Sequence, residues 1–170
     1  MKCNMMDLQI VNHKDILFRD ILRAVAIKSV AWPYPVESQV KWIIENIKPE
    51  DKHVFLTDDG NDEGYMTLSP VNGHINGELV NFYGVGCVCS AKPGQGYGKV
   101  LVESVNEYLN NNQCRGLLFC KQNLIDFYRR FDWVLVQSDK VHIPSLNDGI
   151  FTMVYNCDRV NELRYIDRLF

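Results

Sequence analysis

The sequence predicts one mixed α/β domain that takes in the whole chain, residues 1–170. A chain of 170 residues, of which 46% are hydrophobic, suffices for a single domain with a sizeable core. No repeat, low-complexity tract or Pro/Gly/Ser-rich linker divides it. Apolar segments with strand and helix periodicity alternate in the order β-α-α-β-β-β-α-β-α-β-β, which is typical of a mixed fold.

The first half is expected to hold one strand, two helices and a block of strands. Apolar residues recur at three- and four-residue spacing over residues 15–26, which indicates an amphipathic helix, and Pro33 and Pro35 then interrupt the helical pattern. Asn72-Gly73 and Asn76-Gly77 predict turns between strands. The expected elements are a strand over residues 8–11, helices over 15–26 and 38–47, and strands over 53–57, 64–68 and 78–89.

The second half is expected to alternate helices and strands. Its first helix has an apolar stripe made of Leu101, Val105, Tyr108 and Leu109. The expected elements are a helix over residues 97–110, a strand over 117–120, a helix over 124–131, strands over 133–137 and 150–155, and a closing helix over 159–170.

Charge and hydropathy argue against several classes of protein. The net charge is −3, and no Lys/Arg cluster of the kind that binds nucleic acid stands out. No stretch approaches the roughly 20 apolar residues that span a bilayer, and residues 1–7 lack the features of a signal peptide. We therefore expect a cytoplasmic protein that binds neither nucleic acid nor membranes. The sequence leaves open whether the chain forms a homodimer.

The cysteines do not indicate a metal site. Cys87 and Cys89 lie two apart in an apolar run, on one face of the predicted strand and too close along the backbone for an easy mutual disulfide. There is no CxxC pair and no His/Cys cluster, so no zinc is expected. We expect free, mostly buried thiols. The six cysteines are Cys3, Cys87, Cys89, Cys114, Cys120 and Cys157.

A glycine-rich segment, Gly94-Gln95-Gly96-Tyr97-Gly98, joins the longest apolar strand to the amphipathic helix. A helix N-terminus presents unpaired N–H groups, and glycines let an anion approach the backbone closely. The N–H groups from Gln95 to Lys99 are therefore expected to bind a diphosphate. A P-loop would end in Gly-Lys-Ser/Thr, and a dinucleotide fingerprint has the spacing G-x-G-x-x-G, so neither motif fits. A tight turn that binds no ligand remains the alternative.

The glycine-rich segment lies within a longer motif, Val88-Cys89-Ser90-Ala91-Lys92-Pro93-Gly94-Gln95-Gly96-Tyr97-Gly98-Lys99-Val100-Leu101. It resembles the acetyl-CoA-binding motif of the GNAT superfamily of N-acetyltransferases, Arg/Gln-x-x-Gly-x-Gly/Ala at the end of the fourth strand. Gly96 and Gly98 match its two small positions, and Pro93 stands where Arg or Gln is usual.

A second motif follows, Leu124-Ile125-Asp126-Phe127-Tyr128-Arg129-Arg130-Phe131-Asp132-Trp133. It is similar to the superfamily's Phe-Tyr-x-x-x-Gly-Phe/Trp helix, with Asp132 in place of the glycine and Trp133 retained. The two motifs are separated by one helix and one buried strand, as in the superfamily.

The resemblance implies the GNAT acyl-CoA N-acyltransferase fold, a central mixed, mostly antiparallel sheet with splayed fourth and fifth strands and flanking helices. It also implies acetyl-CoA as cofactor. The backbone of Cys87, Val88 and Cys89 would pair with the pantetheine arm like an added strand. The residues that it assigns to the pyrophosphate are Gly94, Gln95, Gly96, Tyr97, Gly98 and Lys99.

The resemblance makes Tyr128 the general acid that protonates the departing thiolate, and it suggests a weaker cofactor contact at Asn123. A phenol with a pKa of about 10 is a plausible donor to a thiolate whose thiol has a pKa of about 8.5. The alternative is a core aromatic residue, because Phe127 and Phe131 lie close by in the sequence.

The sequence does not reveal the acceptor amine or the general base. Glu78, Glu103 and His74 are base candidates by position alone, and a water chain is the alternative. The residues that could line the acceptor site are Trp32, Tyr34, Phe82 and Tyr83, with core packing as the alternative for each. Cys120 lacks the partnered His that a nucleophilic cysteine requires.

We therefore expect an N-acetyltransferase that acts on a primary amine of a small molecule. The Trp133 ending of the second motif is reminiscent of aminoglycoside-modifying members of the superfamily. Two alternatives stay open: a peptide or protein N-acetyltransferase, and a non-catalytic CoA-binding sensor on the same fold.

Overall fold

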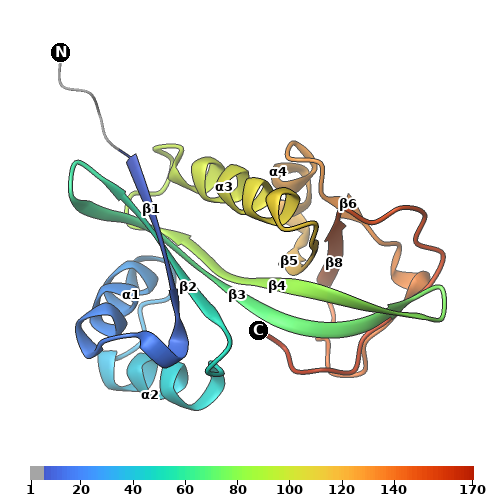
Figure 1. Ribbon diagram of the computed structural model, residues 1–170, viewed down its shortest axis with the longest axis horizontal. Helices are drawn as coiled ribbons and strands as arrows, with labels where there is room; N and C mark the ends of the chain where they lie inside the picture. Colours follow the sequence, from blue (N-terminus) through green and yellow to red (C-terminus); the bar gives the residue numbers. More distant parts are fainter. Residues whose placement is uncertain (1–5) are drawn as a thin grey trace. The chain divides into compact units, whose positions relative to one another are not determined.

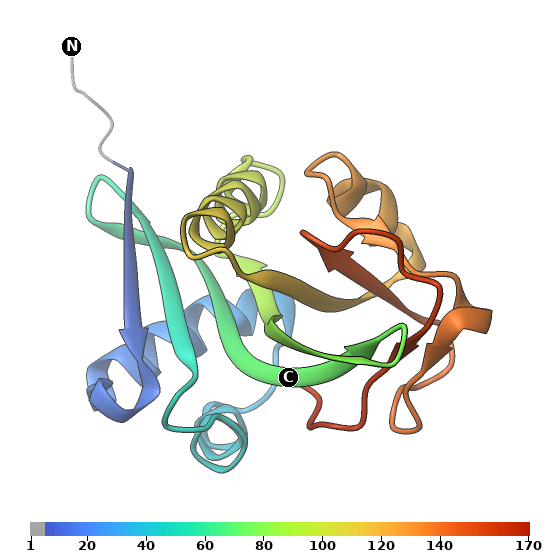
Figure 2. The same ribbon diagram turned by 45° about the vertical axis from the view of Figure 1, so that its right-hand side comes forward.

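The computed structural model describes residues 6–170, which form two compact units (Figures 1 and 2). The first unit takes in the chain as far as Leu68, together with Cys87–Ser104 and Phe170. The second unit consists of Ser69–Gly86 and Val105–Leu169. β3, β4 and one helix, α3, each contribute residues to both units.

In the first unit, α1 and α2 pack on one face of the strands, and α3 packs on the other face. β1 pairs with β2, and β2 with β3, all antiparallel. Phe55 and Tyr65 pack with α1 and α2 in one apolar cluster, and Figure 1 shows both helices on the same side of the strands. Gly64 faces the opposite way, since a Cβ there would come within 2.8 Å of Leu101 in α3. The elements are β1 (Met6–Asn12), α1 (Phe18–Ala31), α2 (Val36–Asn46), β2 (Lys52–Asp58), the first part of β3 (Asn61–Ile75), the end of β4 (Glu78–Ser90) and the start of α3 (Tyr97–Asn111).

The second unit contains the rest of β3, β4 and α3 and the C-terminal strands. Asn76 and Gly77 have φ of 53° and 85° and close the β3–β4 hairpin, which is green in Figure 2. β5 pairs in parallel with β4 and antiparallel with β8, and β8 pairs antiparallel with β6. The further elements are β5 (Arg115–Lys121), α4 (Ile125–Arg129), β6 (Val134–Leu135), β7 (Val141–His142), β8 (Ile150–Tyr155) and β9 (Leu163–Arg164).

The sheet is mixed and mostly antiparallel, with the strand order β1-β2-β3-β4-β5-β8-β6. The register of the parallel pair β4–β5 covers only Phe82–Gly84 against Arg115–Leu117. β4 nevertheless continues to Ser90 and β5 to Lys121. The backbone of β4 beyond Gly84 therefore has no β5 partner in this register, which is the loss of pairing expected for splayed fourth and fifth strands.

The elements predicted up to residue 155 occur in the predicted order, with β7 as an additional short strand, but several local predictions are wrong. Asn72-Gly73 is not a turn, because β3 runs through it. A Cβ on Gly73 would come within 3.2 Å of both the Arg164 carbonyl oxygen and the Phe82 ring, so the glycine permits close packing instead. The predicted strand over residues 133–137 is reduced to Val134–Leu135.

The predicted closing helix over residues 159–170 is also wrong. The segment contains β9, which pairs with β3 and β7, and no helix. The Asn76 side chain accepts hydrogen bonds from the N–H groups of Asn161 (2.8 Å) and Glu162 (3.0 Å). Long-range hydrogen bonds thus hold the tail extended, whatever its local helical pattern.

The cysteines and the hydropathy of the helices were also subjects of prediction. Cys87, Cys89, Cys114, Cys120 and Cys157 are free thiols, with Cys89 and Cys120 buried, and Cys3 lies outside the described residues. Between residues 6 and 170, no helix combines the length and the hydropathy that crossing a bilayer requires.

A buried histidine makes stability depend on pH. His53 is fully buried, and its ring nitrogens lie 2.8 Å from Nδ1 of His13 and 2.7 Å from the Tyr65 hydroxyl oxygen. Burial, followed by the neighbouring His13, lowers the pKa of His53 to about 4. Between about pH 6.5 and 4 the unfolded chain binds more protons at this residue, so stability falls as the pH falls through this window.

We expect urea unfolding to show a free energy of unfolding lower by about 2–3 kcal/mol at pH 4.5 than at pH 7.5 from this residue alone. His53→Asn is expected to reduce that difference. An equal pH dependence in wild type and His53→Asn would contradict the assignment.

Candidate functional site

The end of β4 contains a backbone irregularity at Cys87. This residue has φ 53°, a left-handed conformation that is unusual for a residue with a side chain and costs free energy inside a strand. Cys87 and Val88 are half-buried, whereas Cys89 is buried in the core of the first unit. The change in direction occurs in the part of β4 that has lost its β5 partner.

The glycine-rich loop follows β4 directly and opens α3. Gly94 and Gly96 have φ of 83° and 88°, the left-handed region that favours glycine. A Cβ added at either position would meet no atom within 4 Å, so the surface of the loop is open. The loop therefore needs its glycines for backbone conformation, and it leaves room for a ligand.

The first turn of α3 has unpaired donors. The first hydrogen bond of the helix runs from the Val100 N–H to the Gly96 carbonyl oxygen, at 3.3 Å. The N–H groups of Tyr97, Gly98 and Lys99 consequently have no partner within the helix. The Gln95 N–H points to the Lys92 carbonyl oxygen at 3.4 Å, a long turn bond. The helix start offers an anion three backbone donors and the positive end of its dipole.

The charged side chains around the loop are already paired. Lys92 forms an ion pair with the buried Glu63, and Lys99 with Glu103 at 3.7 Å. The Tyr97 hydroxyl donates to an Asp58 carboxylate oxygen at 2.9 Å. An anion at this loop would thus be held mainly by backbone N–H groups and not by an unpaired lysine.

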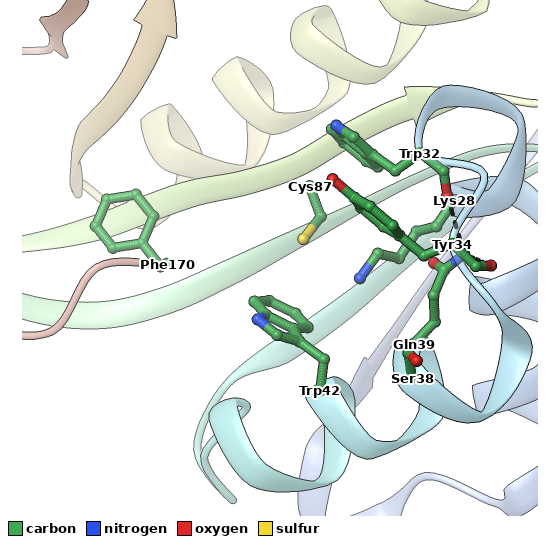
Figure 3. A pocket seen from close by; sticks show the side chains of 8 residues that line it. All are labelled: Lys28, Trp32, Tyr34, Ser38, Gln39, Trp42, Cys87 and Phe170. Atoms are coloured by element: carbon green, nitrogen blue, oxygen red, sulfur yellow. Dashed lines mark hydrogen bonds between the residues drawn. The ribbon is translucent and has the colours of Figure 1, made fainter. Parts of the chain in front are cut away.

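A cavity of about 480 Å³ lies in the first unit beside the break between α1 and α2 (Figure 3). The Gln39 side-chain amide donates to the carbonyl oxygens of Trp32 (3.0 Å) and Tyr34 (3.2 Å) and so holds the two-proline break in place. We call this cavity the α1–α2 pocket, and its lining residues are Lys28, Trp32, Tyr34, Ser38, Gln39, Trp42, Cys87 and Phe170.

The pocket includes residues that the sequence analysis missed. Trp32 and Tyr34 were candidate acceptor-site residues, and both line it. Lys28 was not a candidate, although a lysine that follows Ile21 and Val25 on the apolar face of α1 is an available signal. None of the predicted base candidates, Glu78, Glu103 and His74, is among the described residues that line this pocket.

Tyr128 lies in the second unit, on α4. Its side chain is 6% exposed, and its ring makes edge contacts with Phe127 and Trp133, with centroid distances of 5.1 and 6.2 Å. Burial, followed by the nearby Cys120, raises the pKa of the Tyr128 phenol, so the phenol stays protonated at neutral pH. Burial also raises the pKa of the Cys120 thiol to about 11, which argues against a nucleophilic cysteine.

At the end of α4, Asp132 adopts a left-handed conformation, in the position where the second motif usually has glycine. Asp132 has φ 64°, and the Trp133 N–H donates to the Tyr128 carbonyl oxygen at 3.3 Å. This is the left-handed position at which a helix C-terminus usually has glycine, and Asp tolerates it better than most residues. The substitution at Asp132 therefore preserves the turn that leads to the buried Trp133. Asn123, in the 3-10 turn before α4, is exposed.

The remaining candidate aromatics point to opposite faces of β4. Phe82 is buried, and its ring lies next to Gly73 on β3. Tyr83 makes an edge contact with Tyr108 on α3, with a centroid distance of 5.7 Å. Both pack within the second unit, as the core-packing alternative predicted.

Comparison with known proteins reveals similarity only at the level of structure. No protein-family model matches the sequence, and no curated protein matches it either. ElaA from Escherichia coli superposes with a TM-score of 0.62 at 14% identity over 88% of this chain and 99% of its own. An acyl-CoA N-acyltransferase from Pseudomonas aeruginosa gives 0.62 at 19% identity over the same shares, 88% and 99%.

A third solved structure, the GNAT-family N-acetyltransferase YhbS from Escherichia coli in complex with CoA, gives a TM-score of 0.62. Its identity is 16%, over 96% of this chain and 89% of its own. The chain therefore has the fold of these N-acyltransferases, the fold that the two sequence motifs predicted.

Proposed function

We propose that this protein is an N-acetyltransferase that moves the acetyl group of acetyl-CoA to a primary amine of a small molecule. The observation that carries the proposal is the start of α3, where three N–H groups without a partner in the helix follow two left-handed glycines in an open loop. The GNAT fold supports this reading, since YhbS, which shares it, was solved in complex with CoA.

The loop supplies the pyrophosphate site in this proposal. The N–H groups of Tyr97, Gly98 and Lys99 and the helix dipole bind the two phosphates, and Gly94, Gln95 and Gly96 shape the approach. Because the nearby lysines are paired with acids, binding depends on backbone geometry more than on side-chain charge.

β4 supplies the site for the pantetheine arm. Residues Cys87, Val88 and Cys89 belong to the part of the strand without a β5 partner, so their backbone groups are available to an extended ligand. Cys87 also lines the α1–α2 pocket, which brings the end of this strand to a cavity of a size typical for small-molecule sites. This size favours a small-molecule acceptor over a peptide or protein.

The acetyl group travels as a thioester, which supplies an activated carbonyl. In the proposal the neutral amine attacks that carbonyl, the carbon–sulfur bond breaks, and the thiolate takes its proton from the Tyr128 phenol. The amine loses its proton to solvent. Tyr128 and Asn123 receive these roles from the motif alone.

Two measurements test the proposal. Acetyl-CoA is expected to raise the melting temperature, because it binds only the folded state, and an amine panel is expected to show release of free CoA. No shift at millimolar acetyl-CoA would contradict the cofactor assignment. A shift without turnover of any amine or peptide would favour the CoA-binding sensor, and turnover of peptides alone would favour a peptide N-acetyltransferase.

A further inference from the structure

We propose that the α1–α2 pocket binds an acceptor that carries a single carboxylate next to an aromatic or apolar body. The inference rests on the proposed function for the acetyl transfer itself, but the binding preference is measurable without it. It starts from one side chain, Lys28, which enters the pocket from α1 (Figure 3).

Lys28 has no anionic partner among the described residues. The residue is 7% exposed, and it forms no hydrogen bond or ion pair with any residue between 6 and 170. Its ammonium nitrogen lies 4.2 Å from the centroid of the Trp42 ring, a cation–π contact. Figure 3 shows this nitrogen directed into the cavity. A bound anion would complete its interactions.

The acidic groups of α1 and of the segment before β2 are engaged elsewhere. Asp20 forms an ion pair with Arg23 at 3.0 Å. A carboxylate oxygen of Asp51 accepts a hydrogen bond from the Lys48 N–H at 2.8 Å. No Asp or Glu is among the described residues that line the pocket.

The other residues that line the pocket indicate which kind of molecule would carry the anionic group. Among the described residues of the lining, Trp32, Tyr34, Trp42 and Phe170 are aromatic, and Lys28 is the one cation. A single positive charge matches a monoanion such as a carboxylate, whereas a phosphate dianion would require further donors. The rings favour a flat or apolar body over a polyhydroxylated one.

The same charge determines which form of the amine is bound. A cation repels an ammonium ion bound next to it and lowers the pKa of a nearby amine. It therefore favours the neutral amine that acetyl transfer requires, and it disfavours polycationic acceptors. Aminoglycosides are thus the negative controls for this inference.

The test compares probes that differ in one charge. L-Phenylalanine and N-acetyl-L-phenylalanine carry the carboxylate, and L-phenylalaninamide and N-acetyl-L-phenylalaninamide do not. Binding is followed by tryptophan fluorescence, since Trp32 and Trp42 line the pocket. We expect each acid to bind about 10- to 100-fold more tightly than its amide, as expected for a charge-assisted hydrogen bond.

Three variants test whether the preference for the carboxylate depends on Lys28. Lys28→Met keeps the length of the side chain and is expected to remove the preference while amide binding persists. Lys28→Arg keeps the charge and is expected to retain it. Lys41→Met is the matched control on α2, because Lys41 is exposed and pairs with Glu45 on the same helix, so the wild-type preference should persist.

The outcomes separate this inference from the proposed function. The carboxylate pocket would be overturned if the wild type bound acid and amide equally well, or if it did not bind the acids at millimolar concentration. Tight binding of aminoglycosides would also overturn it, and so would a preference for the acids that survives Lys28→Met. An acid preference in a protein that acetyl-CoA does not stabilise would support the carboxylate pocket and refute the acetyltransferase. Acetyl-CoA binding without an acid preference would do the reverse.

Discussion

Gly96→Val is expected to abolish the rise in melting temperature that acetyl-CoA causes. Gly96 has φ 88°, a conformation that a β-branched residue adopts only with strain, and it precedes the unpaired N–H groups of Tyr97, Gly98 and Lys99. A valine would both distort the start of α3 and place methyl groups in the open space that an anion would occupy. Isothermal titration with acetyl-CoA measures the loss, which we expect to exceed about 100-fold in Kd.

The control for Gly96→Val is the same substitution at another glycine with a similar backbone conformation, Gly77. Gly77 has φ 85° and open space around its Cβ position, but it lies in the β3–β4 hairpin. Gly77→Val is expected to lose a similar amount of stability, on the order of 1–2 kcal/mol, with unchanged acetyl-CoA binding. Tight binding by Gly96→Val would show that the loop is only a structural turn.

Tyr128→Phe is expected to lower kcat by about 100-fold and to change the Km for acetyl-CoA little, because general acids contribute about 10²–10⁴-fold to such reactions. The substitution removes one oxygen and keeps the ring contacts with Phe127 and Trp133, so the melting temperature should change little. Burial raises the pKa of Tyr128, and wild-type kcat should therefore not decline between about pH 8 and 10 through loss of this proton.

Tyr155→Phe is the matched control for the phenol. The Tyr155 hydroxyl accepts a hydrogen bond from the Asn110 side chain at 3.0 Å, so its removal should lower stability by about 1 kcal/mol and leave kcat unchanged. Wild-type turnover by Tyr128→Phe would remove Tyr128 from the chemistry and leave it as a buried aromatic residue of α4.

The elements that sequence reasoning predicted best depend on local chemistry. The span of β8, residues 150–155, and the start of α3 at Tyr97 agree with prediction, because an apolar run and a glycine-rich helix start carry their own signals. The Asn76-Gly77 turn agrees for the same reason, since both residues have positive φ. The two motifs likewise predicted the GNAT fold that the solved structures confirm.

The errors concern features that depend on distant residues. Asn72-Gly73 has the composition of a turn, but its glycine is needed because Arg164 and Phe82 approach it closely. Residues 159–170 have a helical pattern, but Asn76 and β3 hold them extended. Local propensity amounts to a few tenths of a kcal/mol per residue, so tertiary hydrogen bonds and packing readily override it.

The sequence by itself determined the order of elements, the glycine-rich start of α3 and the helix that presents Tyr128, because each follows from backbone preferences within a few residues. Only the tertiary structure decided that Lys28 lies in an aromatic pocket without an ion-pair partner among residues 6–170, and that Cys87 lines the same cavity. Burial and the lack of a counter-charge result from the packing of α1, α2 and β4 together. A single sequence records no such packing, and for this reason the carboxylate preference could be inferred only from the folded chain.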